Sequence, residues 1–499
     1  MELQFHKSLI PCAQTLTREV QNQELTQEVR LTDGMPDIGR VLASWGQLLI
    51  RSKEWRSGSV GVSGGVMAWV LYLPEDGQIP QSVAAWLPFQ MKWDIGDAPR
   101  DGNIHVMPLL RGIDARSVSA RKLMVRAGIG VQAEATVPAE VEYYTPSEDV
   151  QDVNILKNTY PLRVPTEAGE KVFSLEEALS LPDTAPQVDK IIRYELHPAV
   201  SEEKVVSDKV VLRGAANLHV LYLDPQGKLN SWDFEIPFSQ FAQLDKEYDA
   251  DATASLSLVP TSLELEQGEE DQLNFKAGLI GQYMIYNGQT VTLAEDAYSN
   301  LREVTPRFEM FRVPARLDSS MQKEEVEQSV QTQVTRPVDV SFTVEHPRLY
   351  REESGVAGEM AGMFQVLGYD ENGELGADAI HWEQSFAIPA GDNTRVEASV
   401  TAMARPSASY MGDKTTLRGE LSREVATFWD QGMPMMVGLE LGEAKEPNPE
   451  RPSVILRRAG QESLWELAKN AGSTVEAIQK ANNLQSEPQE NQMLLIPVM

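Results

Sequence analysis

Two short motifs in this sequence have residue types and spacing that could support catalysis. Gly61–Gly65 reads Gly-Val-Ser-Gly-Gly, the pattern around a serine nucleophile, and Met411–Thr415 matches the end of a phosphate-binding loop. A nucleophile elbow needs a helix after the serine, whereas the alternating run Val66–Leu73 predicts a strand there. The second motif lacks the first glycine and the following helix of a P-loop. We interpret the first as strand and the second as a turn, and expect no enzyme.

Metal and thiol chemistry have little support in the sequence. Cys12 is the only cysteine, which excludes an internal disulfide and a thiolate cluster. The histidines are scattered, and none lies three or four positions from another: His6, His105, His197, His219, His346 and His381. We therefore expect neither a metal site nor a cofactor.

The charge balance narrows the classes of partner. The chain carries 74 acidic and 44 basic residues, a net charge of -30. Such a chain is repelled by nucleic acid and by anionic lipid headgroups, so neither is an expected partner. The start has no basic segment followed by a long apolar one, and no run of 18 apolar residues occurs. The sequence predicts a cytosolic chain without membrane insertion.

An alternating apolar run that ends in a turn occurs three times, at Gly65–Gly77, Gly214–Gly227 and Gly358–Gly373. The first two copies share an offset of 150 residues, which carries Tyr72 onto Tyr222. A fixed period over this length indicates repeated structural units, and period-two alternation indicates strands. We expect the Val-Leu-Tyr residues to fill the core of each unit, with His219 a packed or half-exposed strand residue.

The sequence therefore predicts a mainly β protein with three tandem β-rich repeats, each built from two β halves. They cover residues 1–145, residues 146–300 and, as a divergent copy, residues 301–442. A base on the second half of each unit, at Arg126, Lys276 and Arg418, is expected on a solvent-facing strand surface. The connectors are expected to pack on the sheets, and Ser174–Glu177 has the pattern of a helix capping box.

The C-terminal part has a different composition. Residues 443–452 are rich in proline and predict an extended linker. Residues 453–499 predict a β-α-α-β module, in which Ser463–Glu466 and Ser473–Glu476 are capping boxes that begin two helices. Gly472 is placed to end the first helix, and strands are expected at Val454–Leu456 and Leu494–Ile496.

This module resembles the LysM domain over nearly all of residues 453–499. The resemblance rests on four segments: Ser463–Lys469, Thr474–Ile478, Ala481–Leu484 and Leu494–Pro497. In that family a groove between two loops holds glycans that contain N-acetylglucosamine. The resemblance implies a partner- or glycan-binding groove at Gly460, Gln461, Glu462, Ser463, Leu464, Asn482 and Asn483.

This sequence departs from the family at that groove. It reads Gly-Gln-Glu-Ser from Gly460 to Ser463, where the family has Gly-Asp-Thr/Ser. Capping and turn formation explain Gly460, Ser463 and Asn483 without a ligand, so the structural and the binding interpretations both remain open.

Taken together, the repeats and the module resemble the SipL-type spore coat morphogenetic proteins of Clostridia, which have SPOCS domains followed by LysM. The residues that carry the match are Pro36–Ile38, Pro186–Val188, Val70–Leu73, Val220–Leu223 and Val125–Ala127, with the terminal module. The resemblance implies a scaffold that is made in the mother-cell cytoplasm and assembles on the forespore. Its LysM module would bind a SpoIVA-type coat ATPase. The alternative is a protein that binds peptidoglycan at the cortex or cell wall.

Overall fold

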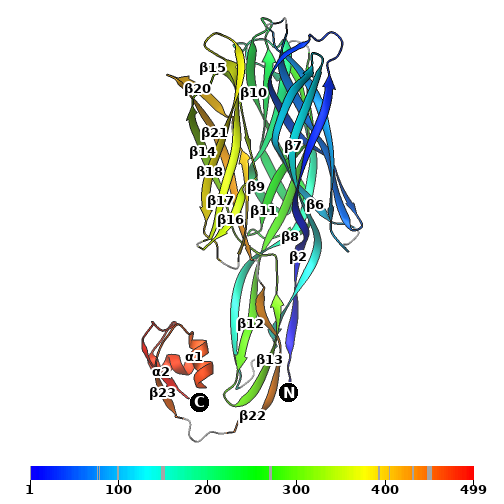
Figure 1. The fold of residues 1–499 in the computed structure, drawn as a ribbon. Coiled ribbons are helices and arrows are strands. Elements are labelled where there is room, and N and C mark those ends of the chain that lie inside the picture. The colour runs from blue at the N-terminus through cyan, green and yellow to red at the C-terminus, as the bar shows by residue number, and fades with distance from the viewer. Residues whose placement is uncertain are drawn as a thin grey trace.

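Long strands run along the axis of an elongated molecule, and a small helical module lies beside its narrow end (Figure 1). The computed structural model describes residues 2–75, 77, 79–97, 101–147, 152–268, 272–353, 355–391, 394–403, 405–429, 432–446 and 452–498. These residues form 24 strands and two short helices, which confirms the mainly β class expected from the alternating runs.

The N-terminal part is a pair of three-stranded antiparallel sheets. One sheet has the order β3 (Ile38–Arg56), β4 (Ser59–Pro74) and β5 (Gln81–Asp94). The other has the order β2 (Phe5–Arg30), β7 (Lys122–Pro146) and β6 (Asn103–Ser119). Apolar residues from both sheets form one buried core, as alternation with one apolar face requires.

The middle part also consists of two facing layers of strands. β9 (Lys190–Leu223) pairs with β10 (Leu229–Tyr248). Its two ends lie together, since the Asp189 N–H donates to the Leu223 carbonyl oxygen at 2.8 Å, and Ala199 passes so close to Gly214 that a Cβ there would collide with it. The facing strands are β11 (Thr253–Gln267), β12 (Gln272–Tyr298) and β8 (Asn154–Ser180). A second buried core lies between the two layers.

The third part is joined to the second by a continuous sheet. β14 (Arg316–Val330), β21 (Lys414–Trp429), β19 (Thr394–Ala402) and β20 (Ser407–Met411) extend the β11–β12–β8 sheet to seven strands. The junction is a single pair, Arg316 opposite Arg163. Facing them are β15 (Arg336–Val344), β16 (Arg348–Glu352), β17 (Gly355–Tyr369) and β18 (Leu375–Ile388).

The narrow end, which we call the stalk, is made by strand ends from distant parts of the chain. β1 (Glu2–Leu3), β22 (Met433–Ala444) and β13 (Arg302–Phe311) form one sheet there, and the ends of β2, β8 and β12 lie against it (Figure 1). Ile10, Val164, Leu293 and Phe311 are among its buried core residues. Part of the expected linker 443–452 belongs to β22, and residues 447–451 lie outside the described residues.

The C-terminal module contains β23 (Val454–Arg458), α1 (Leu464–Ala471), α2 (Val475–Asn482) and β24 (Met493–Pro497). Its order is the expected β-α-α-β. Ser463 begins α1 with a complete capping box, and Gly472 ends it at φ 67°. The second expected box is wrong, since Thr474 rather than Ser473 caps α2 and accepts from the Ala477 N–H.

The expectation that the Val-Leu-Tyr residues fill the core of each unit is only partly correct. Val220 and Tyr222 do so, but Leu221 points to the opposite face. There it meets Leu71 and Leu367, its counterparts in the first and third parts, in a shared central core where all three are at most 1% exposed. These strands are buried on both faces, so alternation alone did not separate the two environments.

The 150-residue offset also has a direct structural counterpart. The Tyr72 hydroxyl donates to the Pro36 carbonyl oxygen at 3.1 Å, and the Tyr222 hydroxyl donates to that of Pro186 at 3.0 Å. The two bonds join the corresponding strand and lead-in in the first and second parts. The division into three units remains a prediction.

The connector before the second part was wrongly expected to be a linker with a short helix. Ser174–Glu177 lies inside β8, which pairs with β12 along its length. Phe173 and Leu175 are buried while Ser174 is exposed, the alternation of a strand.

Candidate functional site

The first loop of the predicted groove is organised by helix capping. The Glu466 N–H donates to Ser463 Oγ at 3.2 Å, and the Ser463 N–H donates to Glu466 Oε2 at 2.9 Å. Gly460 and Gln461 are exposed in the loop before this cap, whereas the Leu464 side chain is buried in the module core. The capping function expected for Ser463 is therefore present in the structure.

Two polar groups of this loop are already bonded to other residues of the module. The Leu464 N–H donates to Oε2 of Glu487, which lies in the loop after α2, at 2.8 Å. Glu462 forms an ion pair with Arg457 on β23. Glu487 was missed by sequence reasoning, because nothing in its local pattern marks a residue that spans two loops.

The second segment of the predicted groove is also engaged internally. The Asn482 side chain donates to the Leu495 carbonyl oxygen at 2.6 Å and accepts from the Leu495 N–H at 2.7 Å. Asn483 ends α2 in the left-handed region at φ 55°. Among the described contacts no hydrogen bond joins the two segments directly, and Glu487 provides the connection between the loops.

The module is bound to the stalk through one face of α1 and the following loop. Asp296 of β12 accepts from Trp465 Nε1 at 2.7 Å and pairs with Lys469 Nζ at 2.8 Å. The Tyr298 hydroxyl and the Asn300 amide donate to the Ser473 carbonyl oxygen at 3.0 and 2.9 Å.

The aromatic part of this contact is buried. The ring of Tyr298 meets that of Trp465 edge to face, with centroids 4.8 Å apart, and Tyr298 is a member of the module core. Burial raises the pKa of Tyr298 to about 12, so its hydroxyl remains a neutral donor at physiological pH. We call the set Asp296, Tyr298, Asn300, Trp465, Lys469 and Ser473 the latch.

Removing the acidic member of the latch should loosen the module. Asp296→Ala deletes the acceptor for Trp465 and the partner of Lys469, and bonds to a charged group contribute about 1.5–3 kcal/mol each. We expect roughly tenfold faster hydrogen exchange in the amides of residues 293–300 and 464–471, measured by mass spectrometry. Asp318→Ala, on exposed β14, is the control. Unchanged exchange in Asp296→Ala would show that the latch does not hold the module.

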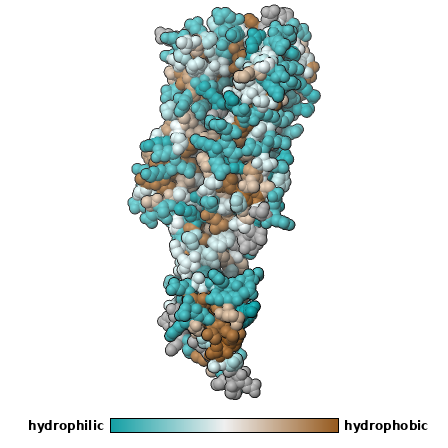
Figure 2. All heavy atoms as spheres, turned by 90° about the vertical axis from the view of Figure 1, so that its left-hand side faces the viewer, coloured by the Kyte–Doolittle hydropathy of each residue, from teal (hydrophilic) through white to brown (hydrophobic). Residues whose placement is uncertain are grey.

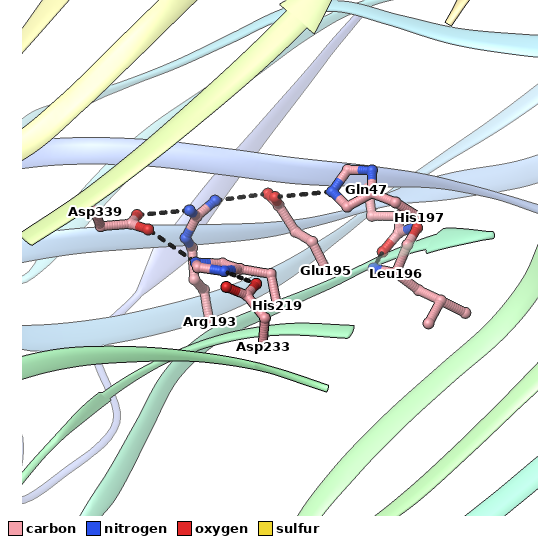
Figure 3. Close-up of polar contacts among 8 residues, drawn as sticks. All are labelled: Gln47, Arg193, Glu195, Leu196, His197, His219, Asp233 and Asp339. Carbon is pink, nitrogen blue, oxygen red and sulfur yellow. Dashed lines mark hydrogen bonds and ion pairs between the residues drawn. The ribbon is translucent and has the colours of Figure 1, made fainter. Parts of the chain in front are cut away.

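A second cluster of charged residues is buried where the three parts meet (Figure 3). Arg193 of β9 has a fully buried side chain, with Nη2 2.6 Å from Asp339 Oδ2 on β15 and Nη1 2.9 Å from Glu195 Oε1. Its guanidinium lies 4.4 Å from the centroid of the Trp45 ring on β3. One side chain therefore contacts strands of all three parts.

His219 and its neighbours extend this cluster. Its Nε2 lies 2.8 Å from Asp339 Oδ1 and its Nδ1 lies 2.6 Å from Asp233 Oδ1, so each ring nitrogen faces a carboxylate (Figure 3). Arg405 reaches the other Asp233 oxygen at 2.6 Å. His219 does share the face of Leu221, but it is a bridging member of a buried network rather than an ordinary packed residue.

The electrostatics keep two carboxylates of this network ionised. Burial by itself would raise the pKa of Asp339, but the charges of Arg193 and His219 hold it well below its usual range. The same competition, with Arg193 as the main opposing charge, lowers the pKa of Glu195. A cluster with no solvent access at Arg193 suits the joining of strands rather than turnover of a substrate.

The two motifs that could have supported catalysis have the expected local structures. Ser63 lies inside β4, and its hydroxyl pairs with that of Ser52 at 2.8 Å. Met411 lies opposite Lys414 across a turn with Gly412 at φ 72°. Within the described residues, no group of three His, Cys, Asp or Glu side chains is arranged to hold a metal ion.

The three strand bases are exposed, as predicted. Lys276 pairs with Glu176 at 2.6 Å, and Arg418 Nε donates to Glu327 at 2.9 Å. Arg126 lies opposite Thr26 on β2 with its side chain outward. Exposed pairs of this kind stabilise by at most about 1 kcal/mol and mark no site by themselves.

Comparison with protein-family models identifies two regions of the chain. Residues 187–265 match the model described as SipL, SPOCS domain, and residues 461–497 match the LysM domain. The first match covers β9, β10 and most of β11, and the second covers both helices and β24. Neither the curated proteins nor the solved structures include a match. No described helix is long and apolar enough to cross a membrane.

Proposed function

This chain is a SPOCS plus LysM protein, and we propose that it is a non-enzymatic scaffold of the spore envelope that links coat proteins to the forespore surface. The domain pair fits a sporulation coat protein whose LysM module belongs to a peptidoglycan-binding class. Domains of these two kinds are non-catalytic binding modules.

The observation that carries the proposal is that the polar groups of the predicted groove are bonded to other residues of the module. Glu487 accepts from the Leu464 N–H, Arg457 pairs with Glu462, and Asn482 is bonded to the backbone of β24. A neutral sugar would have to compete with a carboxylate for the Leu464 N–H, and bonds to charged acceptors are about twice as strong as neutral ones. This favours a protein partner over a glycan.

The partner that we propose is a SpoIVA-type coat ATPase, and the location is the mother-cell cytoplasm at the forespore surface. The latch supports a scaffold, because it fixes the module to the stalk at one end of an elongated molecule (Figure 1). We include in this proposal the three units at residues 1–145, 146–300 and 301–442, and the module at residues 453–499.

Capture of the purified coat ATPase tests the proposal. We expect the immobilised full-length chain to retain it, and a chain that ends at residue 452 to retain roughly tenfold less, because the module holds the central contacts of the interface. Full-length Arg418→Ala, altered only on an exposed strand face, is the control and should behave as wild type.

Two results would contradict the proposal. One is wild-type capture by the shortened chain. The other is saturable binding of N-acetylglucosamine oligomers to the full-length chain, as the alternative function predicts. Glu487→Ala should then bind the oligomers more strongly, because that change frees the Leu464 N–H.

A further inference from the structure

The two-stranded sheet of the module has one apolar face that no other described part of the chain covers. Leu494 and Ile496 of β24 are buried against the helices. The opposite face carries large apolar side chains that are 46–63% exposed: Val454 and Leu456 on β23, and Met493 and Leu495 on β24. An apolar patch is visible low on the C-terminal module in Figure 2. Leu456 and Leu495 are direct cross-strand neighbours at its centre.

The hydrogen-bond phase of this sheet shows which backbone groups point outward. The Val498 N–H donates to the Ser453 carbonyl oxygen and the Ala459 N–H donates to that of Gln492. In an antiparallel ladder, bonded pairs alternate, so Ile455 and Arg457 bond to β24. The N–H and C=O groups of Val454, Leu456 and Arg458 must therefore point away from β24.

The two edges of the sheet differ in whether their outward backbone groups are hydrogen-bonded. On β24 the outward groups of Leu495 are bonded to the Asn482 side chain, as described above. On β23, no hydrogen bond within the described residues reaches the outward groups of Val454, Leu456 or Arg458.

Elsewhere in the molecule, side-chain amides close strand edges in the same manner as Asn482. The Gln47 amide bonds to both backbone groups of Leu196, at 2.6 and 2.9 Å. The Gln282 amide bonds to both backbone groups of Val106, each at 2.9 Å. An open edge with exposed apolar side chains is a template for another strand, and proteins normally close or charge such edges. β23 combines the open edge with the apolar face.

We propose that the open edge of β23 binds an extended segment of a protein partner, which adds a third strand to this sheet. Main-chain bonds to Val454, Leu456 and Arg458 supply affinity, and alternate side chains supply specificity. On the apolar face the segment places aliphatic residues beside Val454 and Leu456. It places a carboxylate beside Arg458, for which the described contacts show no acidic partner.

The charge of the chain distinguishes this occupant from two others. A second copy would bring together two chains of net charge -30, and an anionic membrane surface would repel the same charge. A segment of another protein needs only one carboxylate opposite Arg458. The inference rests on the proposed role of the module as a protein-binding unit, but it does not use the groove residues.

A synthetic strand tests the site directly on the full-length chain. The probe is a fluorescein-labelled peptide, Glu-Thr-Val-Thr-Val-Thr-Lys, which in antiparallel pairing sets its glutamate beside Arg458 and its valines beside Leu456 and Val454. The control peptide has the same sequence with methylated backbone nitrogens at the amides that face β23. We expect saturable binding of the first by fluorescence anisotropy, and at least roughly tenfold weaker binding of the second, because it loses the main-chain bonds.

Two variants of the chain separate the backbone from the charge. Leu456→Pro removes an outward N–H but no bond to β24, so the module should fold, and binding should fall about tenfold. Arg458→Glu should weaken binding about fivefold, and a probe with lysine in place of its glutamate should restore it. Lys480→Glu, on exposed α2, should have no effect. Circular dichroism checks the fold of each variant.

The inference is overturned if both peptides bind equally, if neither binds, or if vesicles of phosphatidylserine bind the chain through β23 instead. If Leu456→Pro disturbs the fold, the methylated peptide and the Arg458 charge exchange still decide the matter.

Capture of the coat ATPase separates the two proposals. If Leu456→Pro captures it fully while the chain ending at residue 452 does not, the inference fails and the proposed function stands. If the shortened chain captures it fully but β23 binds the probe, the function fails and the strand site stands.

Discussion

Replacing Arg193 with methionine should lower the free energy of unfolding by about 3–5 kcal/mol, measured by urea denaturation. The substitution keeps much of the apolar stem but removes the charge that pairs with Asp339 and Glu195. Both carboxylates are almost completely removed from solvent, at 2% and 12% side-chain exposure, so they would remain as buried charges with one cation fewer. The contact with the Trp45 ring is lost as well.

Arg213→Met is the matched control, because Arg213 lies on the same strand but pairs with Glu202 at an exposed position. We expect it to change the free energy of unfolding by less than about 1 kcal/mol. Equal effects of the two substitutions would mean that the buried network does not hold the three parts together.

Leu221→Ala should cost about 2–5 kcal/mol of unfolding free energy, although Leu221 belongs to neither layer of the second part's own core. Its side chain fills the central core together with Leu71 and Leu367, and truncation leaves a cavity that three packed strands cannot close without moving one another. Urea unfolding curves of the full-length chain provide the measurement.

The control is Leu317→Ala, at a leucine that is 42% exposed on β14, with an expected loss below about 1 kcal/mol. A further check uses Leu71→Ala alone and combined with Leu221→Ala. The two losses should not be additive, because the residues line one cavity. Strict additivity, or a loss at Leu221 as small as at Leu317, would contradict a shared core.

The local features of the fold were well predicted from sequence. The strand at Gly214–Gly227 and the helix that begins at Ser463 follow from short-range rules of alternation and capping, which need only neighbouring residues. Of the three predicted capping boxes only the one at Ser463 is present, and the box at Ser174 shows why such a local rule fails. A cap contributes about 1 kcal/mol, and the pairing of β8 with β12 over its whole length outweighs it.

The long-range features were not accessible in this way. Alternation marks Val220, Leu221 and Tyr222 as a strand that is apolar on both faces, but it does not show that one face belongs to a different part of the chain. The partner of Arg193 is Asp339, 146 residues away, and that of Leu464 is Glu487 in another loop. The structure places the predicted groove residues in two segments, around the start of α1 and the end of α2, and their role in binding stays a prediction. Glu487, the acid that connects the two loops, has no local signature.

The seven-stranded sheet that runs from β11 to β19 has a consequence for how the molecule loses its structure. Domains that follow one another in sequence and share no core normally unfold independently. Here the second and third parts share a sheet, and all three share the central leucines and the Arg193 network, so fraying of one part would expose apolar and charged groups of the other two. The three parts should therefore unfold as a single cooperative unit, and the C-terminal module, whose core includes Tyr298 of the stalk, is joined to that unit through the latch.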